Sequence, residues 1–265
     1  MVYIALFVVG SLVGMFSYYI ENRLCNGESI VKPGFHCENC NHRLSWYESI
    51  PVVSYILLQG KCKKCKIKLS KEYIIYEILA GILFSLSYYL YGFSSEFFIM
   101  VLLFTLLVNI YITDFKYMII HIIPIIITIV GIILTYLISS GLLFTTMYIL
   151  LYLYDGIFIF LILLGIKLLG NILLKKETFG WGDILLSIIA GLLFGFKGGL
   201  VFIIISLILA LPYGIINKVL NKKIKIPFGP FMVTSMCLLY IFYSNISELL
   251  SIIGVSIWKE LSIYY

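Results

Sequence analysis

The feature that most constrains this chain is a series of apolar runs, most of them long enough to cross a lipid bilayer. A helix needs about 20 apolar residues to span the hydrocarbon core. Eight runs approach that length, at residues 2–20, 73–91, 97–113, 119–139, 147–169, 184–196, 199–217 and 228–243. They lack the alternation of a membrane β-barrel, and only 12% of the residues are charged, about half the share of a soluble domain. The sequence therefore predicts an all-α polytopic membrane protein of about eight transmembrane helices.

Lysine and arginine are distributed unevenly between the two sides of the predicted membrane. Residues 1–20 lack a basic start and a small-residue cleavage site, which favours a retained first helix over a signal peptide. One side of the membrane then carries 17 of the 19 Lys and Arg residues, and the other side carries Lys197 and Lys259. Basic residues favour the cytoplasm, so we expect the N-terminus outside and the polar loop, residues 21–72, inside. Residues 73–243 would form the membrane core, and residues 244–265 an interfacial or extracytoplasmic segment.

The polar loop contains two Cys-x-x-Cys pairs, Cys37 with Cys40 and Cys62 with Cys65. Two residues between thiolates allow both to reach one ion from a tight turn, and two such pairs form the tetrahedral site that Zn²⁺ prefers. Four thiolates leave no open position for water, so we interpret the predicted zinc site as structural. The alternative is a pair of disulfides or free thiols, which the spacing disfavours.

Two aspartates stand at the membrane boundary on the side of that loop. Asp114 follows the third apolar run, and Asp183 precedes the sixth within a Gly-x-Gly-Asp sequence formed with Gly180 and Gly182. A carboxylate there is costly unless it faces water, a partner or a substrate, and two close carboxylates can share a proton, as aspartic proteases require. The glycines would let an extended substrate approach. The alternative is that each aspartate only caps a helix, Asp183 as the N-cap before Ile184.

Two further acids, Glu77 and Asp155, lie inside predicted spans, where a structural carboxylate is expensive. We expect Glu77 to support the site or to pair with a basic residue. Together with Asp114 they leave a second class of function open, an ion- or proton-coupled transporter with a path of carboxylates. A third is a non-catalytic scaffold that docks cytosolic partners through the zinc loop. Because Asp114 and Asp183 share one membrane face and no internal repeat is evident, the residues favour an enzyme.

Taken together, these residues resemble the type IV prepilin peptidases, polytopic aspartic proteases that also methylate their product. The resemblance extends over nearly the whole chain and is carried by Cys65, Glu77, Asp114 and the segments 27–30, 37–40, 44–52, 54–55, 60–62, 180–183 and 227–231. It implies that Asp114 and Asp183 are the catalytic pair, and that cleavage follows a glycine on the cytoplasmic side of a bacterial membrane. It also implies methylation of the new N-terminal amine by S-adenosylmethionine, for which no glycine-rich nucleotide loop identifies a site.

The implied substrate is a prepilin or pseudopilin, in which a short basic leader precedes an apolar helix. That helix can enter the lipid bilayer, which is the second expected partner. The basic residues are localised by the membrane topology, so no nucleic-acid partner is expected. Because the cytoplasmic face is itself basic, acidic side chains of the loop must contact the leader. We expect Glu28 and Glu48, which lie in the family-like stretches, to be among them.

Overall fold

The computed structural model describes residues 1–30, 34–37, 39–140, 142–175, 177–220 and 226–243. The predicted C-terminal segment, residues 244–265, lies outside the described residues. The described chain is all-α, apart from two isolated β-bridges in the segment that connects α1 to α3. It divides into two units, Met1–Ile119 (unit 1) and Ile120–Tyr265 (unit 2), which are described in turn.

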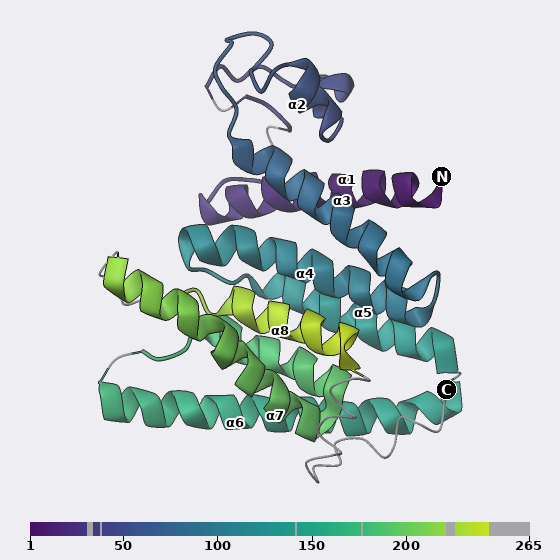
Figure 1. The fold of residues 1–265 in the computed structure, drawn as a ribbon, viewed down its shortest axis with the longest axis vertical. Helices are drawn as coiled ribbons and strands as arrows, with labels where there is room; N and C mark the ends of the chain where they lie inside the picture. Colours follow the sequence, from purple (N-terminus) through teal and green to yellow (C-terminus); the bar gives the residue numbers. More distant parts are fainter. Residues whose placement is uncertain (31–33, 38, 141, 176, 221–225, 244–265) are drawn as a thin grey trace. The chain divides into compact units, whose positions relative to one another are not determined.

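The structure confirms an all-α polytopic membrane protein. The described helices are α1 (Val2–Cys25), the 3₁₀ helix η1 (Trp46–Ser49), α2 (Val53–Leu57), α3 (Lys71–Tyr91), α4 (Ser95–Tyr117), α5 (Ile122–Ser140), α6 (Leu142–Leu174), α7 (Trp181–Leu220) and α8 (Gly229–Ile241). Six of them, α1 and α3 to α7, are long and apolar enough to cross a membrane (Figure 1).

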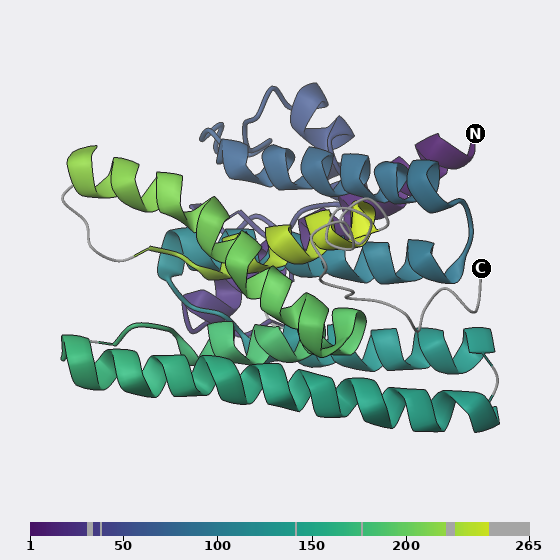
Figure 2. The same ribbon diagram turned by 60° about the horizontal axis from the view of Figure 1, so that its bottom comes forward.

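α7 combines two of the predicted spans, residues 184–196 and 199–217. It is interrupted at Gly195, whose φ of 65° and ψ of −173° are not helical. This backbone conformation is essentially restricted to glycine. Figure 2 shows the two parts of α7 running in different directions. Residues 181–194 rise only ~21 Å, and α8 has 13 residues, so the eight predicted spans correspond to six helices of spanning length, one bend and one shorter helix.

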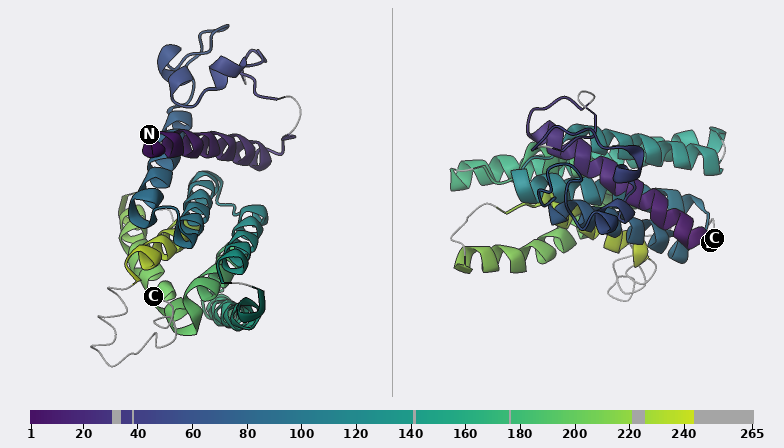
Figure 3. Two further views of the ribbon diagram at one scale, coloured as in Figure 1. Left: turned by 90° about the vertical axis from the view of Figure 1, so that its right-hand side faces the viewer. Right: turned by 90° about the horizontal axis from the view of Figure 1, so that it is seen from above.

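Unit 1 is built on a close crossing of α1 and α3. A Cβ added to Gly10 would lie 2.6 Å from the backbone oxygen of Ala80, and one added to Gly14 would lie 2.6 Å from that of Tyr76. Small residues four positions apart allow two membrane helices to approach in this way. The described residues between the two helices, 26–30, 34–37 and 39–70, form a loop lobe beyond the start of α3. Figure 3 shows this lobe from two further sides.

Unit 2 is organised around the packing of α6 against α7. A Cβ added to Gly191 of α7 would lie 2.4 Å from the Cα of Gly156 in α6. Around this crossing Ile159, Ile189 and Phe202 are fully buried. The short connection between these two helices leads into the Gly-x-Gly-Asp sequence, of which Gly180 lies in the connection and residues 181–183 lie in the first turn of α7.

Candidate active site and metal centre

Asp114 lies near the C-terminal end of α4, and only 6% of the residue is exposed. The helix ends three residues later, at Tyr117, because Met118 adopts a left-handed conformation (φ 56°) and donates its N–H to the backbone oxygen of Asp114 at 3.1 Å. The carbonyl groups at a helix C-terminus carry partial negative charge. The helix dipole therefore opposes a negative charge at this position.

Asp183 occupies the opposite kind of helix end. α7 begins at Trp181, so Asp183 is its third residue, and the alternative interpretation of Asp183 as the N-cap before Ile184 is wrong. Its Oδ2 accepts the backbone N–H of Gly180 at 3.0 Å, as the third residue of a helix does in a capping box. The residue is 7% exposed. Here the helix dipole stabilises a negative charge, so the two aspartates have opposite electrostatic settings.

The two glycines beside Asp183 have different surroundings. A Cβ added to Gly180 would lie 3.2 Å from Asp183 Oδ2, so a side chain there would press on the carboxylate. A Cβ added to Gly182 would lie 2.5 Å from the Cβ of Ile120. Gly182 is therefore required for packing of the start of α7 against Ile120. The approach of a substrate to these glycines stays a prediction.

Polar side chains of α6 support the turn before Asp183, and they were missed by the sequence reasoning. Asn171 Oδ1 accepts both the backbone N–H of Thr178, at 2.9 Å, and its hydroxyl, at 3.1 Å. The Nζ of Lys167, a residue only 5% exposed, lies 4.1 Å from the centre of the Trp181 ring, which is a cation–π contact. The available signal was the pair of polar residues in the last turns of an otherwise apolar span.

The carboxylates predicted to act together are divided between the two units. Asp114 and Glu77 belong to unit 1, whereas Asp183 and Asp155 belong to unit 2. The pairing of Asp114 with Asp183 therefore stays a prediction. Asp155 precedes Gly156 at the crossing of α6 with α7, where a Cβ on Gly191 would lie 2.8 Å from its carbonyl carbon.

The four predicted metal ligands come together in the loop lobe. The Sγ atoms of Cys37, Cys40, Cys62 and Cys65 all lie within 4.8 Å of one another, with separations of 3.8 Å for Cys37–Cys65 and 3.9 Å for Cys40–Cys62. Tetrahedral Zn²⁺ with Zn–S bonds of about 2.3 Å requires sulfurs ~3.8 Å apart. These distances exclude disulfides, whose S–S bond is about 2.05 Å, and the cysteines are free. The cluster fits a metal such as zinc and leaves no ligand position open.

The second cysteine turn repeats the backbone hydrogen bonds of the first. In each turn the N–H of the first cysteine donates to the backbone oxygen five residues later at 2.9 Å. The residue after the second cysteine, Asn41 or Lys66, has a positive φ, 53° or 60°. Each turn leads to a serine, Ser45 or Ser70, that precedes a helix. The two pairs of thiols are thus presented by turns with the same backbone form.

Glu77 connects α3 to the loop lobe. Its Oε2 accepts the backbone N–H of Val52 at 2.6 Å, and the residue is buried. Val52 has φ 62° and ψ −51°, and the N–H of Val53 donates to the oxygen of Pro51, so these residues form a γ-turn of the strained, positive-φ type. A β-branched residue is rare in this conformation. Glu77 therefore holds a strained turn of the lobe against α3.

The two glutamates predicted to meet a leader differ in exposure. The side chain of Glu28 is 55% exposed and lies 3.3 Å from Nε of Arg23. That of Glu48 is 1% exposed, and its Oε2 accepts the N–H of Ser45 at 2.8 Å and lies 3.5 Å from Nε2 of His42. Burial raises the pKa of Glu48, but these two partners outweigh it and hold the pKa below its usual range. Glu28 can meet a leader at the surface, whereas Glu48 can meet only a group that enters the lobe.

Unit 1 contains a cavity of about 440 Å³ between the loop lobe and helices α1, α3 and α4. Its lining is largely aromatic and polar and includes Tyr19, Phe35, Tyr73, Glu48 and Glu77. No sequence motif predicted this cavity, because its residues come from segments that are separated along the chain.

Comparison with known proteins gives two adjacent family matches. The bacterial peptidase A24 N-terminal domain matches residues 8–91, and the type IV leader peptidase family matches residues 101–215. Together the two matches cover well over half of the chain. No solved structure matches it.

Several relatives have names that describe an activity. The prepilin leader peptidase/N-methyltransferase of Myxococcus xanthus is 37% identical over 91 residues, 34% of this chain and 27% of that protein. The protein of the same name from Vibrio cholerae is 33% identical over 129 residues, 44% of this chain and 50% of that protein. The type 4 prepilin-like proteins leader peptide-processing enzyme of Escherichia coli is 27% identical over 206 residues, 76% of this chain and 73% of that protein. The first two matches thus span about a quarter and half of the relatives' own length.

Proposed function

This chain belongs to the type IV leader peptidase family, and on that premise we propose that it is a membrane aspartic endopeptidase for prepilins or pseudopilins. The observation that carries the proposal is the setting of Asp183. Its buried carboxylate is held by the Gly180 N–H at the start of α7, inside the segment that matches the peptidase family. A buried carboxylate at a membrane boundary is expensive unless it acts on a partner or a substrate.

The two helix ends suggest different roles for the two aspartates. Asp183, at the positive end of α7, would be ionised and would take a proton from the attacking water. Asp114, at the negative end of α4, would be protonated and would donate to the carbonyl oxygen of the peptide bond after the leader's glycine. The attack gives a tetrahedral intermediate with two hydroxyl groups. As the peptide bond breaks, Asp183 gives its proton to the leaving amine, and Asp114 regains a proton from one of these hydroxyl groups. This division of one proton between two carboxyl groups is the general chemistry of aspartic proteases.

We propose that Zn²⁺ occupies the four-cysteine cluster and stabilises the loop lobe, which the sulfur spacing supports. The relatives' names include N-methyltransferase, so we also propose that this chain methylates the new N-terminal amine. When bound, S-adenosylmethionine supplies the methyl group, and the amine loses a proton.

The chain is a multi-pass membrane protein of a bacterial family. We propose that it lies in the cytoplasmic membrane with its N-terminus outside and its loop lobe inside, supported by the basic residues on that side. The exposed carboxylate of Glu28 would contact the basic leader, and the apolar helix after the leader would enter the bilayer.

The test is incubation of purified protein in lipid nanodiscs with a prepilin that has a Gly-Phe junction, followed by mass analysis of the product. Wild-type protein should cleave after the glycine, and Asp114→Asn and Asp183→Asn should each abolish cleavage while remaining folded. Asp155→Asn is the matched control, because a transporter that uses Asp114, Glu77 and Asp155 would need it and a peptidase would not. Cleavage by either dyad variant at near-wild-type rate would contradict the assignment.

Infrared difference spectroscopy separates the two aspartates. The difference spectrum between the wild type and Asp114→Asn should contain the absorption of a protonated carboxyl group, and that between the wild type and Asp183→Asn should not. The reverse result would exchange the roles of acid and base without affecting the proposed peptidase activity.

A further inference from the structure

The cavity of unit 1 contains a buried carboxylate of which only one oxygen has a hydrogen-bond partner among the described residues. Glu48 lines the cavity, and its Oε2 is occupied by the Ser45 N–H and by His42. Its Oε1 is buried and has no hydrogen-bond partner among the described residues. An unsatisfied buried carboxylate oxygen is costly. The site is therefore built to accept hydrogen bonds from a group that is not part of the lobe.

Aromatic rings line the same cavity. The ring centres of Tyr19 and Phe35 lie 4.2 Å apart, and those of Tyr18 and Tyr73 lie 4.4 Å apart. Aromatic faces stack on nucleobases and attract cationic centres. The volume of about 440 Å³ is within the usual range for a small-molecule site. The lining thus suits a flat, partly cationic ligand with hydrogen-bond donors.

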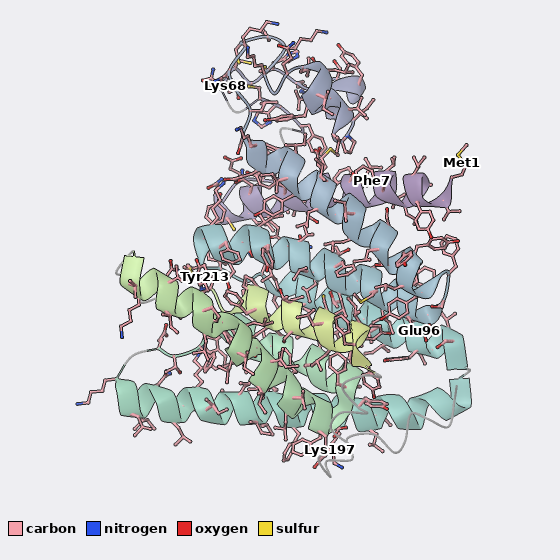
Figure 4. All side chains as sticks on the ribbon, in the orientation of Figure 1. Met1, Phe7, Lys68, Glu96, Lys197 and Tyr213 are labelled. Carbon is pink, nitrogen blue, oxygen red and sulfur yellow. The ribbon has the colours of Figure 1, made fainter. Side chains whose placement is uncertain are left out.

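Two of the four lysines of the lining, Lys63 and Lys116, are held by other hydrogen-bond partners, although the charge of Lys63 also lowers the pKa of Glu48. Lys63 Nζ donates to Tyr47 at 2.7 Å, and Lys116 Nζ to Glu72 at 3.0 Å. Lys68, labelled in Figure 4, lies on the loop lobe and is exposed. An exposed lysine at the rim can meet a carboxylate of the ligand, while the buried part of the lining includes Glu48, Glu77 and the ring of Tyr18.

The cavity also lies close to Asp114 along α4. Lys116 and Tyr117, two and three residues after Asp114, belong to its lining, which corresponds to about 3–5 Å along the helix axis. The Tyr117 hydroxyl donates to Asn22 Oδ1 at 2.7 Å and ties this end of α4 to α1. An amine released beside Asp114 would therefore have a short way to travel to a ligand in the cavity.

We propose that this cavity binds the methyl donor, a nucleoside with a sulfonium centre, and that Glu48 accepts hydrogen bonds from the hydroxyls of its ribose. Carboxylates recognise ribose hydroxyls in this way in nucleotide-binding folds. The aromatic rings would pack against the base and the sulfonium centre. The proposal rests on the methylation proposed above and gives Glu48 a role in place of surface contact with a leader.

The test measures binding of S-adenosylhomocysteine to the full-length protein in nanodiscs by titration calorimetry. Glu48→Gln should raise the Kd by about 10- to 100-fold, because a charged hydrogen-bond acceptor is lost. Ser54→Phe, at a small residue of the lining, should block the cavity without removing a polar contact and should abolish binding. Glu96→Gln is the matched control, because Glu96 lies outside the lining at the far end of α4 (Figure 4).

A ligand series tests the contact itself. Removing the ribose hydroxyls of S-adenosylhomocysteine should weaken binding to the wild type about 10-fold and cause no further loss in Glu48→Gln. Tighter binding of adenosine 5′-monophosphate than of S-adenosylhomocysteine would overturn the proposal in favour of an anionic ligand. Unchanged affinity in Glu48→Gln or in Ser54→Phe would also overturn it.

Zinc content and prepilin cleavage are measured on every variant, because they separate this proposal from the proposed function. The zinc content should stay at wild-type level in Glu48→Gln and Ser54→Phe, which shows that the lobe is folded, and Glu96→Gln should also retain cleavage. A wild type that cleaves prepilin but does not bind S-adenosylhomocysteine would overturn the cavity proposal alone. A wild type that binds it through Glu48 but does not cleave would overturn the peptidase alone.

Discussion

The loop lobe and the turn between α6 and α7 hold their functional residues by different means. In the lobe, two turns with the same backbone hydrogen bonds bring four thiols within 4.8 Å of one another. In the turn, side chains of α6 hold Thr178 and Trp181 in front of Asp183. The lobe has few buried apolar residues, so a metal must supply much of its folding free energy. The turn lies between two packed helices, so several weaker contacts are sufficient.

The largest expected effect is on the lobe. Cys62→Ser removes one of four ligands, and because binding of a structural zinc ion is worth about 10–16 kcal/mol, zinc and the ordered lobe should be lost together. Elemental analysis should find about one zinc ion per wild-type chain and almost none per variant chain. Hydrogen exchange should become fast in residues 39–69 and stay slow in α6 and α7.

Cys25→Ser is the control for this substitution, because Cys25 forms no disulfide among the described residues and lies outside the cluster. It should retain the zinc ion and the protection of the lobe. Retention of zinc by Cys62→Ser would contradict the assignment of Cys62 as a ligand. A loss of hydrogen-exchange protection in α7 as large as that in the lobe would show that the metal does not stabilise the lobe in particular.

A smaller effect is expected in the turn. Asn171→Ala removes the acceptor of two of the Thr178 hydrogen bonds and leaves the longer one, from the hydroxyl to the Lys167 backbone oxygen at 3.4 Å. The turn should therefore loosen, and kcat for cleavage should fall about 10-fold through misplacement of Asp183. KM and zinc content should change little. Thr178→Ser keeps the backbone N–H and the hydroxyl and should retain most of the activity. Wild-type kcat in Asn171→Ala would show that the turn does not position the aspartate.

Much of this architecture could be predicted from the sequence, because local patterns determine it. Runs of about 20 apolar residues can be satisfied in a bilayer only as helices, and the spacing of Cys37, Cys40, Cys62 and Cys65 already defines a closed thiolate site. The predicted extent of spans was less accurate around Gly195, where a glycine joins two runs into one bent helix.

The parts that could not be predicted depend on contacts between distant segments. The bond between Glu77 and the Val52 N–H, the support of Thr178 by Asn171, and the burial of Glu48 each require knowledge of which elements pack together. Glu28 and Glu48 looked equivalent as acidic residues of one loop, but only the structure separates an exposed carboxylate from a buried one. The start of α7 at Trp181 likewise makes Asp183 the third helical residue.

The smallest expected effect is at Glu28, which belongs to neither supporting network. Its side chain is half exposed and pairs only with Arg23 at 3.3 Å in the described lobe, and exposed ion pairs contribute about 0.2–1 kcal/mol. If Glu28 contacts the basic leader, Glu28→Gln should raise KM for prepilin a few-fold and leave kcat unchanged. The increase should disappear when the leader lysines are replaced by glutamine, and it should shrink at high salt because exposed charges are screened. An equal increase for both leaders would show that Glu28 acts on the lobe and not on leader charge. Neither the zinc ion nor Asn171 depends on Glu28. The zinc content would then report whether the loop lobe had been disturbed, and kcat whether the turn between α6 and α7 had been.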